Sequence, residues 1–132
     1  PYNDVGPFHK DKWFWDLGCG KINKNYQRVK IWISILSDNK KLGFRFVRGS
    51  AAKNFEFDSE FRNHIVKPIF DDKRLKKEKI ESVRGKNGSF IIFNDELLHA
   101  GEVINSKKCR LSLEFTFCCN KKNILNLFKF LK

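Results

Sequence analysis

Several segments of the chain alternate between apolar and polar residues with a period of two. This alternation is typical of strands that bury one face. In RVKIWISIL, residues 28–36, four branched apolar residues share one face, and Lys30, Trp32 and Ser34 share the other. The pattern predicts a strand, although its second face mixes a charge, a large aromatic ring and a hydroxyl.

The clearest strand is RLSLEFTF, residues 110–117. Its odd positions are leucine or phenylalanine and form one apolar face. Its even positions are polar: Arg110, Ser112, Glu114 and Thr116. A strand buried in an apolar core is not expected to carry an arginine and a serine on one face, so this polar face requires a separate explanation.

Shorter patterns predict the remaining elements. GFRFV (43–47) and SFIIF (89–93) indicate two short strands opened by Gly or Ser turns. We expect a short helix over 58–66, and a solvated turn or exposed helix in the charge run DDKRLKKEK, 71–79. The C-terminal segment has apolar residues at helical spacing and two candidate N-caps: Ile124, Leu127, Phe128 and Leu131, with Asn120 or Asn123.

Many short strands with turn signals and one or two flanking helices favour a mostly β fold, a β-sandwich or jelly roll, over an α/β fold. The chain has 132 residues, of which 41% are hydrophobic. That length and composition suit one domain covering residues 1–132. It has no apolar run long enough to predict a membrane span.

The chain is strongly basic, with a formal net charge of +12 from 27 Lys and Arg against 15 Asp and Glu. Such a surplus fits nucleic acid, acidic lipid headgroups or an anionic substrate. The lysines are scattered over the whole length, which is more typical of a solvated surface. Four cysteines match no zinc spacing, which indicates reduced thiols in a cytoplasmic protein: Cys19, Cys109, Cys118 and Cys119.

The chain contains three histidines. His9 stands two residues before Asp11, so on an extended strand the imidazole and the carboxylate face the same side. His99 ends an apolar run, either as a strand cap or as a further ligand. Two histidines and one carboxylate on a face of an octahedral ion leave three open positions, as in non-haem Fe(II) oxygenases. His64 has no partner at ligand spacing and reads as a helix-surface residue.

Arg110 suits the planar, bidentate recognition of a carboxylate. Ser112 lies on the same predicted face and can add a hydroxyl to that carboxylate. The alternative is a salt bridge from Arg110 to Glu114 or Glu102. A neighbour four residues along a strand is distant, which favours carboxylate binding.

Taken together and in this order, five segments resemble the Fe(II)- and 2-oxoglutarate-dependent dioxygenases, in particular the phytanoyl-CoA dioxygenase-like branch. The resemblance spans nearly the whole chain. The segments are HKD (9–11), RVKIWISIL (28–36), RGS (48–50) before Ala51, GSFIIFNDELLHAG (88–101) and NSKKCRLSLEF (105–115).

The resemblance implies a double-stranded β-helix, a cupin-like jelly roll with the metal at its mouth. It implies that His9, Asp11 and His99 bind Fe(II), and that Arg110, helped by Ser112, pairs with the distal carboxylate of 2-oxoglutarate. The reaction expected is hydroxylation of a small-molecule substrate by O2, with release of succinate and CO2 and with ascorbate as a supporting reductant. No catalytic residue beyond the metal site is expected.

Two further points bear on these assignments. Lys107 and Lys108 are alternatives to Arg110 for binding the distal carboxylate of 2-oxoglutarate, because some relatives use a lysine for this contact. Asp11 argues against the halogenases of this superfamily, which replace the metal carboxylate with a small residue.

The chain departs from the family in two respects. Relatives often have Pro-Gly-Ser-His where this chain has Arg48 to Ala51. Family members also carry helices and a strand before the first ligand, whereas His9 is almost at the start here. The sequence therefore predicts either a fragment or processed chain, N-terminally truncated, or a pared-down β-helix.

Two other functions compete with the oxygenase. A basic nucleic-acid-binding module would cluster cations and aromatic rings on one face, and FRFVR, residues 44–48, offers a fragment of that pattern. Oxygenases that dealkylate nucleic-acid bases carry a second arginine soon after the first, yet residues 111–120 hold no cation. The other alternative is a catalytically inactive jelly-roll binding protein. The sequence identifies neither the substrate, which the charge suggests is anionic, nor the oligomeric state.

Overall fold

The computed structural model describes residues 6–37, 41–102 and 110–124 and is mostly antiparallel β. Helix α1 and the 3-10 turns η1 and η2 are its short helical elements, and residues 121–124 are also helical. The helical bounds are α1 (Asp11–Asp16), η1 (Ser50–Ala52) and η2 (Asp72–Leu75). The strands are β1 (Tyr26–Ser37), β2 (Lys41–Val47), β3 (Asp58–Arg62), β4 (Ile65–Ile69), β5 (Ile80–Arg84), β6 (Phe90–Asn94), β7 (His99–Gly101) and β8 (Arg110–Asn120).

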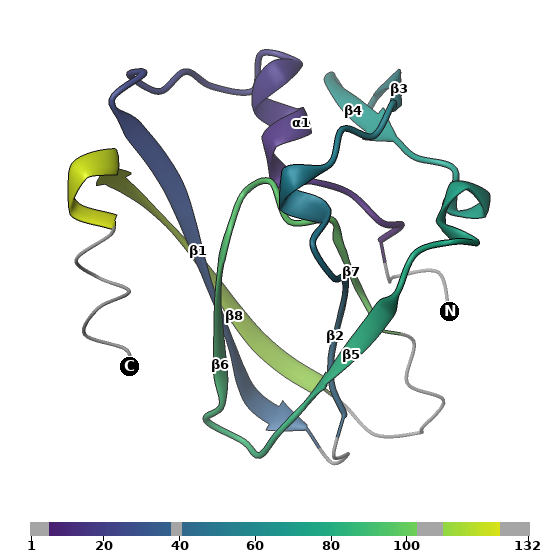
Figure 1. The fold of residues 1–132 in the computed structure, drawn as a ribbon, viewed down its shortest axis with the longest axis vertical. Coiled ribbons are helices and arrows are strands. Elements are labelled where there is room, and N and C mark those ends of the chain that lie inside the picture. The colour runs from purple at the N-terminus through teal and green to yellow at the C-terminus, as the bar shows by residue number, and fades with distance from the viewer. Residues whose placement is uncertain (1–5, 38–40, 103–109, 125–132) are drawn as a thin grey trace.

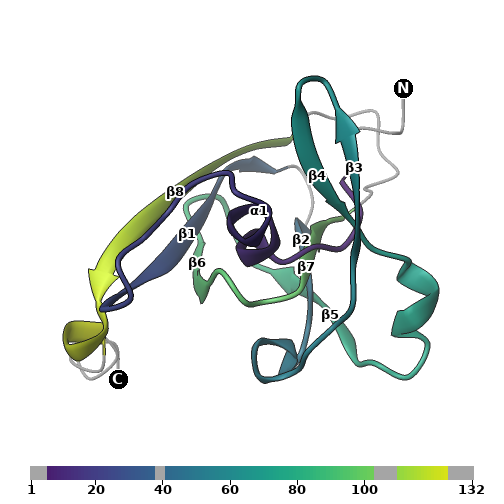
Figure 2. The same ribbon diagram turned by 90° about the horizontal axis from the view of Figure 1, so that it is seen from above.

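The strands form two three-stranded sheets and one hairpin (Figure 1). One sheet has the order β6-β1-β8, the other β5-β2-β7, and β3 pairs with β4. The two larger sheets face each other, and α1 lies over one end of the space between them (Figure 2). Neighbouring strands in each sheet are antiparallel, and β1 runs along β8 with a bulge between Ser34 and Leu36.

The strands predicted over 28–36, 43–47, 89–93 and 110–117 are confirmed as β1, β2, β6 and β8. The predicted cap at Asn120 is also confirmed, since its Oδ1 accepts from the amide of Lys122 at 3.0 Å. The rest of the predicted C-terminal helix lies outside the described residues.

The helix predicted over 58–66 is wrong, because this segment forms most of the β3–β4 hairpin. Asn63 and His64 both have positive φ, at 53° and 65°, and make the two-residue turn. Such a turn matches the twist of a hairpin, and asparagine tolerates positive φ better than most residues. His64 is therefore an exposed turn residue and not a helix-surface residue.

Two apolar clusters hold the sheets. One fills the space between them and joins Trp32 from β1, Phe44 from β2 and Phe93 from β6. The other lies on the far side of the β5–β2–β7 sheet, which we call the covered face. Its buried members come from that sheet and from irregular segments: Phe8, Trp13, Val47, Phe70, Leu75, Leu98 and Ala100.

The far side of the β6–β1–β8 sheet, which we call the open face, is apolar and largely exposed. Strand β8 directs its apolar residues outward and Glu114 inward toward Lys30, but burial alternates only at its start, because residues 113–118 are all exposed. Val29 is a buried exception on the open face. The large exposed side chains there, with their exposed fractions, are Phe90 (58%), Leu111 (53%), Leu113 (47%), Phe115 (45%) and Phe117 (48%).

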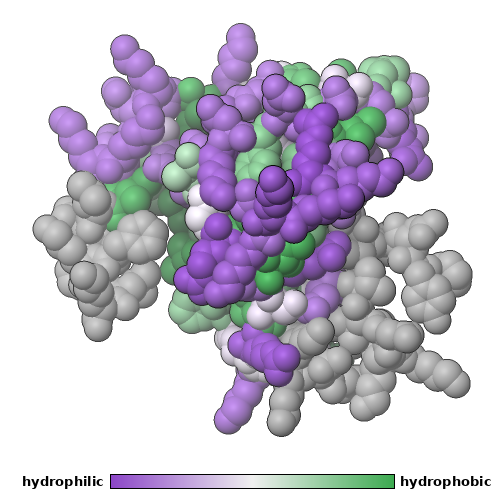
Figure 3. Space-filling model, turned by 45° about the vertical axis from the view of Figure 1, so that its right-hand side comes forward, coloured by the Kyte–Doolittle hydropathy of each residue, from purple (hydrophilic) through white to green (hydrophobic). Residues whose placement is uncertain are grey.

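From the side of β5 the surface is mainly hydrophilic, with smaller apolar areas between the polar side chains (Figure 3). Within the described residues, every helix is too short and too polar to cross a lipid bilayer.

Candidate metal centre

The two histidines predicted as ligands meet across a single antiparallel bridge. The amide of His9 donates to the carbonyl of His99 at 2.9 Å, and the amide of His99 donates back at 3.0 Å. Residues directly opposite each other in an antiparallel pair project their side chains to the same face. The two imidazole rings consequently lie together, with centroids 4.6 Å apart, on the inner side of β7.

Both imidazoles are oriented by the backbone. Nδ1 of His9 lies 2.9 Å from the carbonyl oxygen of Pro7, and Nδ1 of His99 lies 2.9 Å from that of Leu97. A carbonyl oxygen only accepts, so each Nδ1 must carry a hydrogen, and in the neutral ring Nε2 then keeps its lone pair. This arrangement of the second ring nitrogen is the usual one for metal-binding histidines.

Asp11 completes the group from the first turn of α1. Its carboxylate oxygens lie 3.8 Å from Nε2 of His9 and 3.8 Å from Nε2 of His99. Ligand atoms of the three residues all lie within 4.8 Å of one another. The convergence does not arise on a strand, as the spacing suggested: Lys10 is extended and Asp11 begins a helix. Lys10 points away, as expected, and donates to the carbonyls of Ser50 and Lys53.

His99 is the most enclosed of the three. Its ring stacks on Phe44, with centroids 5.2 Å apart, and meets Phe93 at 4.9 Å. Burial, and then the neighbouring His9, lower the pKa of His99, so its ring is neutral near pH 7. A neutral imidazole with a free Nε2 lone pair is the form that binds a metal ion.

Lys30 and Glu114 also belong to this site, and the sequence interpretation missed them. The ammonium of Lys30 lies 3.3 Å from Asp11 Oδ2 and 2.5 Å from Glu114 Oε1. Burial alone would lower the pKa of Lys30, but the hydrogen bond that Lys30 donates to Glu114 and the charge of Asp11 together raise it, so the ammonium stays charged. Lys30 thus pairs with both Glu114 and the carboxylate of Asp11, which lies beside the two imidazoles.

A signal for these residues was present in the alternation. Lys30 and Glu114 occupy the polar faces of the two strands, and those faces turn inward. A buried charge is expensive unless it is paired. Polar faces on two adjacent strands that both carry apolar outer faces therefore indicate a functional interior.

Arg110 begins β8 and reaches across to the other sheet. Its Nη1 donates to the carbonyl oxygens of Gly43 and Glu102, each at 3.1 Å. Glu102 is three residues from His99, which is about 10 Å along extended chain. Neither of the salt bridges considered as alternatives is present within the described residues: Glu114 pairs with Lys30, and Arg110 donates to the backbone carbonyl of Glu102. Within the described residues, Nε and Nη2 of Arg110 make no hydrogen bond.

Gly43 makes this position possible. Its φ is +81°, and a Cβ added there would overlap the Arg110 guanidinium. Glycine adopts this backbone conformation at no steric cost. The glycine thus allows the guanidinium to lie directly against β2.

Ser112 is half-buried on the same side of β8 as Arg110, opposite Ser34 of β1. Ser34 is fully buried, and its hydroxyl has no hydrogen-bond partner within the described residues. Lys107 and Lys108, the alternatives to Arg110, lie outside the described residues, as does Cys109. The other three cysteines are free thiols.

A cavity of about 490 Å3 opens beside α1 and β1. Arg28, two residues before Lys30 on β1, lines it, 3.7 Å from Asp95 and 4.1 Å from the centre of the Trp15 ring. Burial raises the pKa of Asp95. Lys12, the residue after Asp11, lines the same cavity, whereas His9, Asp11 and His99 do not.

The described residues thus bring His9, Asp11 and His99 into one group that can hold a cation, with Lys30 and Glu114 beside it and Arg110 one short strand away. Comparison with protein-family models, with curated proteins and with solved structures finds no match.

Proposed function

We propose that this chain is an Fe(II)- and 2-oxoglutarate-dependent dioxygenase with a double-stranded β-helix fold, and that it hydroxylates a small-molecule substrate. The observation that carries the proposal is the convergence of two Nε2 atoms and one carboxylate, with both Nδ1 atoms held by backbone carbonyls. Two facing antiparallel sheets, with α1 and its Asp11 over one end of the space between them, support the fold assignment.

The donor set fits iron. Two imidazoles and one carboxylate suit Fe(II) and leave positions for a chelating acid and O2. Oδ2 of Asp11 is buried, and its nearest cationic group within the described residues is the Lys30 ammonium at 3.3 Å, so a bound metal ion would share this carboxylate with Lys30. When bound, the iron supplies the redox chemistry that couples oxidation of 2-oxoglutarate to hydroxylation.

The surrounding residues have distinct roles in this proposal. Arg110 binds the distal carboxylate of 2-oxoglutarate through its free Nε and Nη2 donors, and Ser112 adds a hydroxyl. Phe44 and Phe93 cover the ring of His99 and keep water from that side.

The test is anaerobic titration of the protein with Fe(II) and 2-oxoglutarate, followed by the weak visible charge-transfer band of the chelated metal. We expect the band in the wild type. We also expect it in the control His64→Ala, because His64 is an exposed turn residue and not one of the proposed ligands. His99→Ala should remove both metal binding and the band.

The variant Arg110→Ala tests the binding of 2-oxoglutarate separately from the binding of the metal. Metal affinity should stay unchanged, whereas the 2-oxoglutarate midpoint should rise about tenfold to a hundredfold, the usual effect of losing hydrogen bonds to a charged group. Absence of the band in the wild type, or its retention in His99→Ala, would rule out the proposed function.

A further inference from the structure

Among the described residues, the exposed rows of the open face carry no charged side chain. Its rows come from β6, β1 and β8, in which Phe90 pairs with Ile33, and Ile33 with Leu113, across three neighbouring strands. Ile31 likewise pairs with Ile92 on one side and Phe115 on the other. A continuous apolar surface across three strands is unusual for a chain with a net charge of +12.

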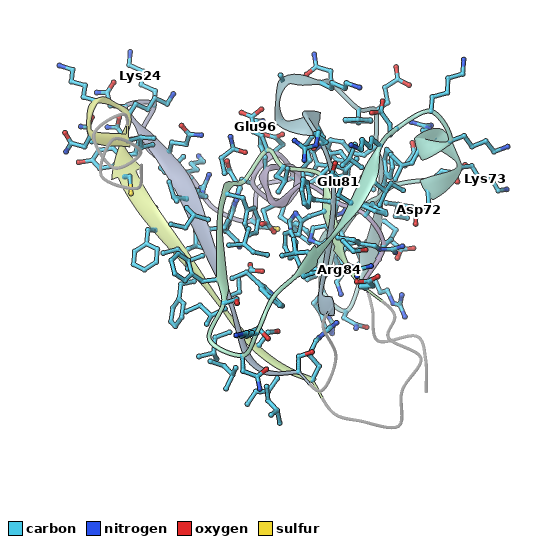
Figure 4. All side chains as sticks on the ribbon, turned by 60° about the horizontal axis from the view of Figure 1, so that its bottom comes forward. Lys24, Asp72, Lys73, Glu81, Arg84 and Glu96 are labelled. Atoms are coloured by element: carbon cyan, nitrogen blue, oxygen red, sulfur yellow. The ribbon has the colours of Figure 1, made fainter. Side chains whose placement is uncertain are left out.

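The labelled charged side chains lie away from the middle of this face, with Lys24 at the end of the sheet (Figure 4). Figure 4 shows phenyl rings and aliphatic chains projecting from β8 away from the other sheet, while the labelled Asp72, Lys73 and Glu81 lie on the opposite side of the molecule. Lys30 and Glu114, the charges nearest in sequence, point inward and pair with each other.

The size of the patch matches an interface. An aromatic side chain has roughly 150–250 Å2 to bury, so the three half-exposed rings leave about 300 Å2 uncovered. The aliphatic residues bring the patch to on the order of 500 Å2, at the upper end for a monomer. Two such patches bury about 1,000 Å2, the lower limit for a specific interface.

We propose that the open face binds the open face of a second copy of this chain. Antiparallel sheets stack face to face about 10 Å apart with interdigitated side chains. A two-fold axis brings the same patch from each copy together, so one self-complementary surface is sufficient. The small area predicts a weak, reversible dimer.

Charge gives this dimer a distinctive salt dependence. Two copies with a charge of +12 each repel one another. The Debye length falls from about 10 Å at 0.1 M salt to about 3 Å at 1 M, which screens that repulsion. Added salt should therefore strengthen the dimer, whereas it would weaken contact with an anionic partner.

Sedimentation of the full chain over a hundredfold concentration range, at low and high salt, tests the proposal. We expect an average mass that rises toward twice 15.6 kDa, and rises further at high salt. Phe115→Lys should leave a monomer at every concentration. The matched control, Phe61→Lys, replaces a 74% exposed phenylalanine on the β3–β4 hairpin and should behave as the wild type.

Three results would overturn the proposal: a wild type that stays monomeric, a dimer that survives Phe115→Lys, or a dimer that weakens with salt. Circular dichroism of Phe115→Lys must match the wild type, and Leu113→Lys provides a second disruption of the same row. One form of the first result would also name the alternative. If the full chain is monomeric and a chain ending at Ile124 is dimeric, residues 125–132 and not a second copy bind the open face.

A separate observation concerns Ser34, and it rests on the proposed function. Its hydroxyl is fully buried on the inner face of β1 and has no hydrogen-bond partner in the part of the chain that the structure describes; its neighbour across the strands is Ser112. A buried hydroxyl left unpaired costs free energy, so such a group in a native interior requires an explanation. We infer that Ser34 donates to the carboxylate that Arg110 binds.

Ser34→Ala tests this inference. We expect 2-oxoglutarate affinity, measured by calorimetry with Mn(II) in place of iron, to fall about fivefold to twentyfold, with Mn(II) affinity unchanged. Stability should be unchanged or higher, because the variant removes an unpaired hydroxyl. Ser59→Ala, on exposed β3, is the control.

The outcomes separate the two claims. Unchanged 2-oxoglutarate affinity in Ser34→Ala, with normal binding by the wild type, would overturn only the role of Ser34. A wild type that binds Mn(II) but no 2-oxoglutarate would overturn the proposed function as well.

Discussion

The outer faces of the two large sheets differ in what lies over them. The covered face packs Val47 and Ala100 against Phe8 and Leu98, all with no more than 1% of their surface exposed. The open face carries residues of the same apolar character, yet its phenylalanines remain about half exposed. Both sheets alternate with the same period, so alternation alone did not decide which face would be buried.

The difference lies in the segments that pack on each sheet. Irregular chain covers one side: the residues before α1, the 55–57 segment and η2 supply the apolar partners of the covered face. Within the described residues no comparable segment packs over the open face. Local pattern sets the direction of a side chain, but a distant segment must supply its partner.

The largest expected effect is on the covered face. Leu98→Ala removes a fully buried side chain next to His99, and we expect a loss of about 2–5 kcal/mol in the free energy of unfolding. Urea denaturation measures it. Leu98→Met, which nearly conserves volume, should cost less than about 1.5 kcal/mol. A loss below about 1 kcal/mol for Leu98→Ala would show that the two faces are energetically alike.

Gly43→Ala acts where the two sheets are joined. The backbone conformation disfavours alanine, and the new Cβ displaces the Arg110 guanidinium, so we expect a loss of about 1–3 kcal/mol. Gly49→Ala is the matched control, because Gly49 also has positive φ, at +75°, but open space around it. Only Gly43→Ala should also weaken 2-oxoglutarate binding. Equal effects of the two variants would show that Arg110 does not depend on Gly43.

On the open face the corresponding truncation should cost little. Leu113 is already 47% exposed, so Leu113→Ala should lose about 1 kcal/mol or less in the monomer. The measurement requires a protein concentration well below that at which dimers form. A loss above about 2 kcal/mol there would mean that the row around Leu113 is buried in the monomer, which would remove the contrast between the faces.

The smallest effect concerns Glu81, at the surface of β5. Hydrogen bonds from Arg48 and then Lys79 lower its pKa to about 2. A carboxylate with a lowered pKa stabilises the fold above its unfolded value of about 4.3, and this contribution is lost as the pH falls toward 2. An NMR titration of the Glu81 carboxyl carbon should show the low midpoint, and Arg48→Gln should raise it. A midpoint near 4.3 in the wild type would contradict the ion pair.

Much of the candidate site could be predicted from the sequence. The residues His9, Asp11 and His99 were selected by type and order, and they lie together. The spacing of His9 and Asp11 predicts that they converge on a strand. In the structure Asp11 stands on a helix, and the bridge to His99 orients His9. Lys30 and Glu114 were missed, since neither spacing nor composition shows that two polar faces meet.

The sequence by itself determined the strands β1, β2, β6 and β8, because their period-two alternation is a local property of each segment, and it determined the chemical types available for a metal site. The tertiary structure alone decided which face of each sheet is buried, which histidine lies against which carboxylate, and that Gly43 admits Arg110. These outcomes depend on contacts between residues far apart in the chain. No local pattern encodes such contacts, because the free energy of burial belongs to the pair of surfaces and not to either segment.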